Sequence, residues 1–345
     1  MAELQEIKLG YSAAATPRTT VKVDTNCGVV SVTIVGEREN NKLFPLITLH
    51  DFGFDHESQF RSLERSGEDA DKFFAQFVTY HIDLPGCEED AGDVAGPYPS
   101  LDELAGIIVH VRSSLSITDP IVLLGVGAGA NIAMRYMVKH TRTVVGVILV
   151  EVTNDSETWT KWTQDKITDL IMKPSDVVTA RTRTPGELAS SLLDKHFGRT
   201  ASPTHILTDC RQYLTQRMLT SLNIKNLGLY QQSFYQRKPI PSTDFTEKTV
   251  VPALVISGKQ SWRNDASIDA RAELQTSGKE VTLLEPSPCY LLPLEEASKK
   301  SAISMMLFIQ SIGIGLSAGL TSGASLQSAY KRVENPVEMK DPVVV

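Results

Sequence analysis

The stretch Ile121-Val-Leu-Leu-Gly-Val-Gly-Ala-Gly-Ala-Asn131, which continues into Ile132-Ala-Met-Arg-Tyr-Met-Val138, decides the fold. Its apolar start predicts a buried strand, its glycines a sharp turn, and its continuation a helix. A strand, a sharp turn and a helix with the pattern G-x-S-x-G form a nucleophile elbow, in which the serine attacks an acyl group. Here Gly125 and Gly129 form the frame, and Gly127 stands at the nucleophile's place. Glycine has no side chain that could attack, so the sequence predicts the elbow without its nucleophile.

Strand and helix signals alternate along the chain on both sides of this stretch. The helical spacing of Leu101–Leu115, with Ser100 as its N-cap, lies between two short apolar runs. Such alternation predicts an α/β protein with a mostly parallel sheet and helices on both faces. A turn signal at Asn26-Cys27-Gly28 predicts an opening hairpin. The predicted strands are Val21–Val23, Val29–Ile34, Leu43–Leu49, Phe77–Ile82, Ile121–Leu124, Val144–Val150, Val250–Ser257 and Glu280–Leu284.

The domain organisation follows from where these signals stop and return. Residues 155–248 are polar and helix-biased, and they lie between two groups of predicted strands. We expect them to form a helical cap inserted into one α/β domain at 21–317. Residues 1–20 are expected to be an N-terminal arm, and the Gly/Ser/Ala-rich 318–345 a flexible C-terminal tail.

The composition excludes some classes of partner. The 345 residues carry a net charge of −7, and no Lys/Arg-rich run is interleaved with aromatic residues, so nucleic acid is not an expected partner. The polar N-terminus lacks the apolar run of a signal peptide, and the 4 cysteines lack C-x-x-C spacing. These features predict a cytoplasmic protein with free thiols. No cofactor is expected. The cysteines are Cys27, Cys87, Cys210 and Cys289.

The segment Ala302–Leu320 is the candidate for membrane contact. No charged residue lies between Lys300 and Lys331, and the segment is long enough to span a bilayer. Serines and glycines interrupt it, however, which favours an amphipathic final helix that ends at the glycines over a stable membrane span. Contact of this segment with a membrane surface or a partner is the alternative.

Two further loops extend the interpretation of the elbow towards an α/β-hydrolase fold. His50-Asp51-Phe52-Gly53 follows the first predicted parallel strand, where these enzymes place an oxyanion-hole amide, and Asp83-Leu84-Pro85-Gly86 ends the next strand. Ligands of open α/β sheets bind at such carboxyl ends. We therefore expect a vestigial ligand-binding pocket, lined by His50, Asp51, Gly53 and Ala128.

Triad catalysis in this fold also requires an acid and, after the last strand, a histidine. None of the 7 histidines follows His205, although strands are predicted beyond residue 250. By position, Ser261 stands at the acid's place and Tyr290 at the histidine's place. The chain is therefore not expected to be a triad hydrolase, because loss of the triad removes about 10⁶-fold in rate.

Several motifs of this sequence together carry a resemblance to one family. The chain resembles the N-myc downstream-regulated (NDRG) family of non-catalytic α/β-hydrolase-fold proteins over roughly Val21–Leu316. The resemblance implies a signalling protein that acts through protein contacts in growth, differentiation, stress response or vesicle trafficking. The tail departs from the family pattern, because the basic residues Lys331 and Arg332 follow its serines and do not precede them, so phosphoregulation of the family kind is not expected there. The motifs are His50-Asp51-Phe52-Gly53-Phe54 with His56, Asp83-Leu84-Pro85-Gly86, Tyr98-Pro99-Ser100-Leu101-Asp102-Glu103-Leu104-Ala105, Gly125-Val126-Gly127-Ala128-Gly129-Ala130 and His196-Phe197-Gly198.

A dinucleotide-binding oxidoreductase is the first alternative. Gly125-x-Gly127-x-x-Ala130 fits the fingerprint G-x-G-x-x-G/A, and Glu151 lies about twenty residues further on, where a ribose-binding carboxylate is expected. Against this alternative, the motif lies in mid-sheet, whereas a fingerprint usually follows the first strand of its domain.

Three other functions remain open for the residues around the elbow. A hydrolase of non-standard mechanism would use Asp51, Asp83 or Tyr290. A binding protein would hold a small apolar molecule under the cap. A metal site would use the loop residues His50, Asp51, Asp55 and His56, but these lie too close in sequence to form a site unaided, so no metal is expected.

Restoring the nucleophile with Gly127→Ser is predicted to give no substantial esterase activity, because no histidine is available as its base. Hydrolysis of p-nitrophenyl acetate by the purified variant checks this. A large gain in turnover would show that another residue acts as the base.

Overall fold

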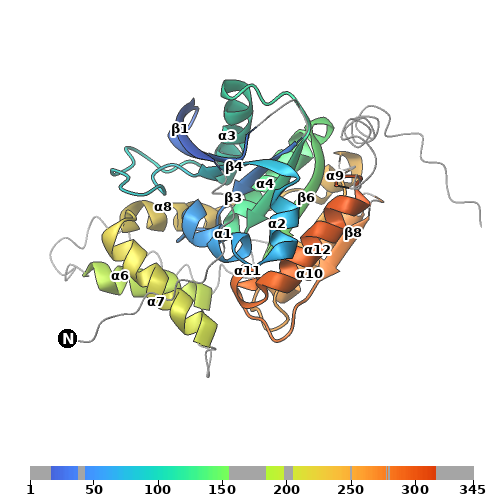
Figure 1. The fold of residues 1–345 in the computed structure, drawn as a ribbon. Helices are drawn as coiled ribbons and strands as arrows, with labels where there is room; N and C mark the ends of the chain where they lie inside the picture. The colour runs from blue at the N-terminus through green and yellow to red at the C-terminus, as the bar shows by residue number, and fades with distance from the viewer. Residues whose placement is uncertain are drawn as a thin grey trace, which may run out of the picture.

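The computed structural model describes residues 17–37, 43–154, 184–197, 205–248, 251–276, 278 and 280–315. These residues form an 8-stranded sheet in the order β1-β2-β4-β3-β5-β6-β7-β8 (Figure 1). The strands are β1 Arg18–Thr25, β2 Gly28–Val35, β3 Phe44–Leu49, β4 Phe77–Asp83, β5 Ile121–Val126, β6 Val144–Val150, β7 Ala253–Ile256 and β8 Val281–Leu284.

The direction of each strand follows from the length of its connection. The short link Asn26-Cys27 between β1 and β2 allows only an antiparallel hairpin, and β2 also pairs antiparallel with β4. All other pairs are parallel, and helices connect their strands. The hairpin and the parallel sheet expected from the sequence are confirmed, although β1 begins at Arg18, earlier than the predicted Val21.

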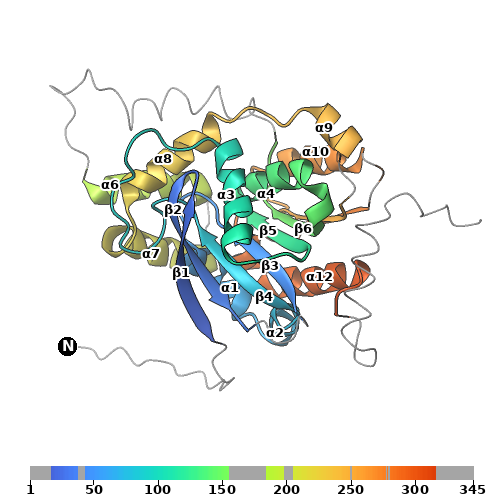
Figure 2. The ribbon, with the colours of Figure 1, turned by 90° about the horizontal axis from the view of Figure 1, so that it is seen from above.

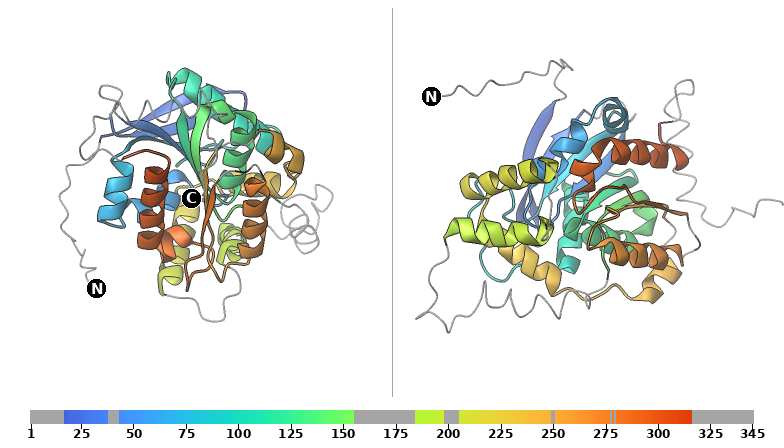
Figure 3. Two further views of the ribbon diagram at one scale, coloured as in Figure 1. Left: turned by 90° about the vertical axis from the view of Figure 1, so that its right-hand side faces the viewer. Right: turned by 90° about the horizontal axis from the view of Figure 1, so that it is seen from below.

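Helices cover both faces of the sheet (Figures 2 and 3). Side chains alternate along β5: Leu123 belongs to a core shared with α3, α4 and α10, and Leu124 to a core shared with α1, α2 and α12. Buried parallel strands of this kind read as continuous apolar runs, as they do here. The helices are α1 His56–Glu64, α2 Glu68–Phe74, α3 Leu101–Ser114, α4 Ala128–Lys139, α6 Pro185–Phe197, α7 His205–Thr220, α8 Ile224–Tyr235, α9 Ser242–Lys248, α10 Asn264–Gln275, α11 Pro293–Glu296 and α12 Ser298–Ser311, with a 3₁₀ turn at Thr141–Thr143.

The described helices of the expected cap, α6 to α9, lie in the chain between β6 and β7. Two of them contact the carboxyl ends of the first parallel strands. From α8, the Tyr230 hydroxyl donates to the carbonyl of His50 over 3.1 Å. From α7, Arg217 forms an ion pair with Asp55, the residue that caps α1. The end of the sheet that carries the elbow therefore also carries the cap.

The final described helix, α12, packs its residues Ala302, Met305 and Ile309 against the sheet and exposes Ile303 and Leu307. It ends at Ser311, just before Gly313, as the predicted amphipathic helix should. None of the helices in the described ranges is long and apolar enough to cross a membrane. The expected arm before residue 17 and the expected tail at 318–345 lie outside the described residues.

Close backbone packing fixes α4 against the sheet and explains the glycines of the elbow. A Cβ on Gly129 would lie 2.3 Å from the carbonyl oxygen of Leu49, and a Cβ on Gly125 would lie 2.5 Å from the carbonyl oxygen of Gly129. The helix begins at Ala128, within the stretch expected to form the glycine turn, because only Gly127 lies between the strand and the helix.

We predict that Gly129→Ala destabilises the protein by about 3 kcal/mol, because the carbonyl of Leu49 belongs to a central strand and cannot move away. Urea unfolding measures the change. Gly92→Ala is the matched control, because a Cβ at Gly92 meets nothing within 4 Å. Equal stability of the two variants would contradict this account of the packing.

Candidate functional site

Gly127 connects β5 to α4 at the point where a hydrolase carries its nucleophile. Its backbone has φ 53° and ψ −112°, a positive φ that costs a non-glycine residue about 1–3 kcal/mol. Its amide donates to the carbonyl of Val150 at the end of β6 over 2.8 Å. The turn keeps the shape of an elbow, and glycine removes its conformational strain.

The place of the missing nucleophile is filled by the side chain of Asp51. A Cβ built on Gly127 would lie 2.0 Å from Oδ2 and 2.1 Å from Cγ of Asp51. Atoms cannot approach so closely, so the carboxylate occupies the volume that a serine side chain would need.

The same carboxylate occupies the amides that would form an oxyanion hole. Oδ1 of Asp51 accepts hydrogen bonds from the backbone amides of Phe52, over 2.9 Å, and Ala128, over 2.8 Å. In hydrolases of this fold the hole consists of the amide after the nucleophile and an amide from the loop after β3. Ala128 and Phe52 supply these two amides here, so the chain places its own anion where a reaction's oxyanion would form.

The second oxygen of Asp51 is paired with Arg263, which precedes α10. Nη1 of Arg263 lies 2.9 Å from Oδ2 of Asp51, and the two side chains are only 1% and 4% exposed. The guanidinium also lies over the rings of Phe52 and Phe234, at 5.6 and 5.8 Å from the ring centres. A buried ion pair is stable only when its groups are well bonded. The two amides and Arg263 meet that need for Asp51.

Ser261, at the expected place of the acid, belongs to a second buried network. Its hydroxyl donates over 2.8 Å to Glu151, which also accepts from the amide of Gly258 over 2.7 Å and from the hydroxyl of Ser257 over 3.2 Å. Burial raises the pKa of Glu151 to about 8, although these three donors and the nearby Arg263 oppose the rise. Ser261 therefore orients a buried carboxyl group.

Tyr290, at the expected place of the histidine, lies in a loop against the one that carries Gly258. A Cβ on Gly258 would lie 1.8 Å from the carbonyl oxygen of Tyr290, so the two loops touch through their backbones. The amide of Tyr290 donates over 3.0 Å to Glu296, and its hydroxyl makes no hydrogen bond within the described part of the chain. The structure thus brings Gly127, Asp51 and Ala128 together but does not join the Tyr290 side chain to them.

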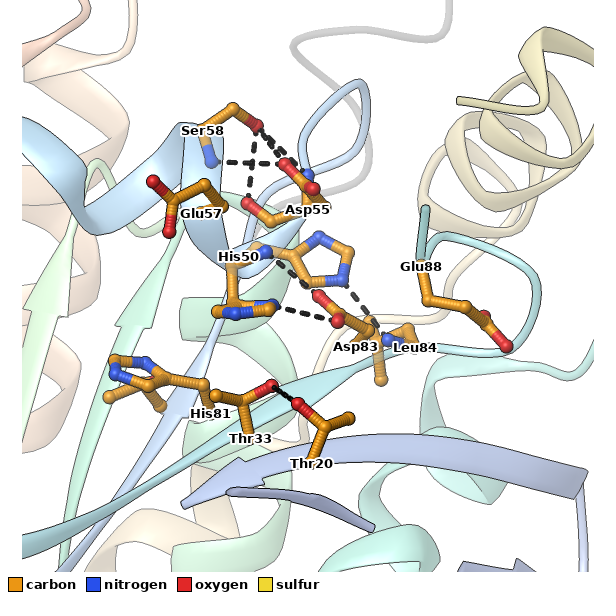
Figure 4. Close-up of polar contacts among 12 residues, drawn as sticks. Thr20, Thr33, His50, Asp55, Glu57, Ser58, His81, Asp83, Leu84 and Glu88 are labelled. Carbon is orange, nitrogen blue, oxygen red and sulfur yellow. Dashed lines mark hydrogen bonds and ion pairs between the residues drawn. The ribbon is translucent and has the colours of Figure 1, made fainter. Parts of the chain in front are cut away.

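His50 is a buried structural residue with both ring nitrogens bonded. Nε2 accepts from the amide of Leu84 over 3.1 Å, so Nδ1 carries the proton and donates to the carbonyl of Asp51 over 2.8 Å. Figure 4 shows this ring beside Leu84 and Asp83, at the ends of the strands. Gly53, with φ 84°, lies in the turn that follows Asp51. Of the four expected pocket residues, Asp51 and Ala128 are bonded to each other, His50 binds the backbone carbonyl of Asp51, and Gly53 lies in the adjacent turn.

The other candidate ligands in this loop have separate partners. Nδ1 of His56 donates to Asp83 over 2.7 Å. Burial opposes protonation of this ring, but the hydrogen bond and charge of Asp83 outweigh it and raise the pKa of His56. Asp55 caps α1 by accepting from the amide of Ser58. Within the described residues, no group of three His, Cys, Asp or Glu side chains is placed to hold a metal ion.

The groups that a dinucleotide would need are also engaged. Glu151, the expected ribose ligand, is 1% exposed and bonded as above. At the start of α4, the amide of Ala128 is bound to Asp51 instead of facing a phosphate. These contacts weigh against the dinucleotide alternative.

The sequence did not single out Arg263, because a single arginine in a loop cannot be distinguished by sequence from an exposed arginine. Glu151 was noticed, but for a role in ribose binding and not for its bonds to Ser257 and Ser261. Both residues become significant only when loops far apart in sequence meet at one end of the sheet.

Comparison with known proteins places this chain in a family. A model of the Ndr family matches residues 20–316. Protein NDRG1 of Xenopus tropicalis is 29% identical, over 87% of this chain and 72% of its own. Protein NDRG2 of Mus musculus is also 29% identical, over 96% of this chain and 93% of its own. The resemblance found in the sequence is confirmed.

Two solved structures of enzymes share this fold at low sequence identity. A thermophilic esterase from Thermogutta terrifontis has a TM-score of 0.63 at 17% identity, covering 85% of this chain and 99% of its own. An enol-lactonase from Burkholderia xenovorans LB400 has a TM-score of 0.62 at 16% identity, covering 84% and 100%. These matches confirm the expected α/β-hydrolase fold.

The Asp51–Arg263 pair is predicted to act as a unit in stability. Arg263→Met leaves the buried carboxylate without its cation and should cost about 3–5 kcal/mol. Asp51→Asn keeps an oxygen for the amides of Phe52 and Ala128, so Arg263→Met should cost at least about 1.5 kcal/mol less in that background. Urea unfolding of the two single variants and the double variant measures the coupling. Additive costs would mean that the pair contributes nothing as a pair.

Glu151→Gln is predicted to become more stabilising, relative to wild type, as the pH rises. The folded protein holds the Glu151 proton up to about pH 8, whereas the ordinary pKa is 4.5, so wild type loses stability as pH rises between these values. Glutamine does not titrate, so the stability difference should change by up to about 4 kcal/mol between pH 4.5 and 8.5. Unfolding across this range tests it, with the exposed Glu280→Gln as the control that should show no such trend.

Proposed function

This chain belongs to the Ndr family, and we propose that it is a non-enzymatic signalling or adaptor protein that acts through contacts with other proteins. The model of that family covers most of the chain, from residue 20 to 316. We place its action in the cytoplasm, in growth, differentiation, stress response or trafficking, as the resemblance implies.

One observation supports the proposed lack of enzymatic turnover. The carboxylate of Asp51 fills the volume of the nucleophile and accepts hydrogen bonds from the oxyanion-hole amides. Acyl transfer develops negative charge at these amides, and stabilising it is usually the largest single contribution to the rate. A fixed internal anion at the same amides would repel that charge. The oxyanion hole thus offers no residual catalysis, even though its backbone geometry persists.

The carboxylates that a non-standard hydrolase would need are paired with basic side chains of the protein. Asp51 is paired with Arg263, and Asp83 with His56, which it also binds through the backbone amide over 2.8 Å. A general acid or base must exchange its proton with a substrate within hydrogen-bonding reach. Both carboxylates are less than 5% exposed, which favours a structural role for each.

The decisive test compares Gly127→Ser with Gly127→Ser/Asp51→Ala, which also removes the obstructing carboxylate. We expect neither protein to hydrolyse p-nitrophenyl esters or to react with a fluorophosphonate probe, because no base activates the serine. A serine esterase is the positive control, and thermal unfolding confirms that each variant is folded. Probe labelling of the introduced serine at a rate near the control's would refute the proposal for the site.

Action through protein contacts needs its own experiment. Purification of the tagged chain from a native cytosolic extract, with quantitative mass spectrometry of retained proteins and small molecules, should give a stoichiometric protein partner. The interaction should reform between purified components at micromolar concentrations. A stoichiometric dinucleotide in place of a protein would overturn the proposal.

A further inference from the structure

A cavity of about 280 Å³ lies between the core and the cap, away from the elbow. Its walls come from α1 and the loop before it, from α7, and from α11 with the residue before it. Neither Gly127 nor Asp51 borders it. The lining residues are Phe54, Ser58, Arg61, Ser62, Asp209, Cys210, Tyr213, Leu214, Leu292 and Glu295.

The lining of the cavity combines buried apolar side chains with more accessible polar ones. Phe54, Leu214 and Leu292 are at most 4% exposed. Arg61 and Glu295 are more accessible and lie among the polar lining residues. Small-molecule sites in proteins typically combine apolar walls with a few polar groups that fix orientation.

Arg61 is the lining residue whose N–H donors have no acceptor among the described residues. Its guanidinium carbon lies 5.2 Å from the ring centre of Tyr213, a position that directs it across the gap from α1 to α7. None of its N–H groups donates a hydrogen bond, and no carboxylate lies within 4.0 Å of it, within the described part of the chain. A planar cation with free donors is suited to bind a carboxylate by two hydrogen bonds.

Glu295 supplies that carboxylate only in part at neutral pH. Burial raises its pKa to about 7, against the opposing effects of hydrogen bonds with Ser62 and Cys210 and of the Arg61 charge. The group is therefore about half protonated at neutral pH and can donate a hydrogen bond. The pKa of Cys210 is raised to about 12, chiefly by burial, so the thiol stays neutral. Asp209 lies on the exposed side and is paired with His205 over 2.8 Å.

We propose that this cavity binds a small amphipathic carboxylate, with its anionic group at Arg61 and its apolar body on Phe54, Leu214 and Leu292. An engineered cavity of about 150 Å³ holds benzene, so 280 Å³ accommodates an acid with an aromatic ring and a short chain. A positively charged ligand would be repelled by Arg61, and a neutral one would leave the charge of Arg61 uncompensated by the ligand.

Because the cavity is shared by α1 and α7, its ligand would link core and cap. The same two helices are joined at one further point, where Arg217 of α7 pairs with Asp55 at the start of α1. A ligand in the cavity adds a further link between the two helices and favours the docked position of α7. This inference is independent of whether the elbow has activity.

The test is calorimetric titration of the full chain with 3-phenylpropionate at pH 6.5. A ligand of this size is expected to bind with a dissociation constant of roughly 0.1–1 mM. Arg61→Met should weaken binding at least about tenfold. Arg65→Met is the matched control, because Arg65 lies one turn further along, is exposed and does not border the cavity. Its affinity should equal that of wild type.

The pH dependence provides a second readout. As pH rises through 7, Glu295 loses its proton and its charge repels the ligand, so wild-type affinity should fall several-fold between pH 6 and 8. Glu295→Gln should bind at pH 8 as wild type does at pH 6. A fall that persists in Glu295→Gln would contradict this role of Glu295.

Three results would overturn the proposal. One is the absence of heat and of ligand-induced shifts in NMR spectra at 10 mM 3-phenylpropionate. Another is equal binding of 3-phenylpropionamide, which has the same body without the charge. The third is equal loss of affinity in Arg61→Met and Arg65→Met, which would indicate general attraction of an anion and no defined site.

Discussion

The two oxygens of the Asp51 carboxylate join three parts of the chain that are distant in sequence. One oxygen binds amides in the loop after β3 and at the start of α4, and the other binds the side chain of Arg263 before α10. The loops at the carboxyl ends of β3, β5 and β7 are thereby tied to one charge. In an enzyme of this fold the same point is left open for a substrate. Here the Asp51 carboxylate occupies this point and joins the three loops, and the arrangement of the loops depends on it.

The second buried carboxyl group, that of Glu151, performs a related task between β6 and the loop after β7. It binds Gly258, Ser257 and Ser261, and its own backbone is held at a φ of 52°. Asp51 and Glu151 thus make hydrogen bonds and ion pairs within the protein at positions where an enzyme would keep polar groups free for its substrate. Arg263 lies near both groups, so its positive charge offsets part of the free-energy cost of burying each one.

The fold was largely predictable from the sequence, because its strands are buried on both faces and read as apolar runs between turn signals. Gly127 at the centre of the elbow was sufficient to predict a turn without a nucleophile, and the absence of histidine after His205 removed the base. The filling of the site by Asp51 was not predictable. Asp51 was expected to line a pocket, and only the approach of two loops, in three dimensions, shows that its side chain points to the amides. The cavity at Arg61 was missed for the same reason, since its walls come from helices far apart along the chain.

The joint at Asp51 also restricts how such a protein can change. A serine at position 127 collides with the carboxylate, and removing the carboxylate first leaves Arg263 buried without its anion. Removing Arg263 first isolates Asp51 in the same way. Each single step towards an enzyme therefore passes through a less stable protein before any activity could be selected. Once this contact has formed, the loss of catalysis is difficult to reverse.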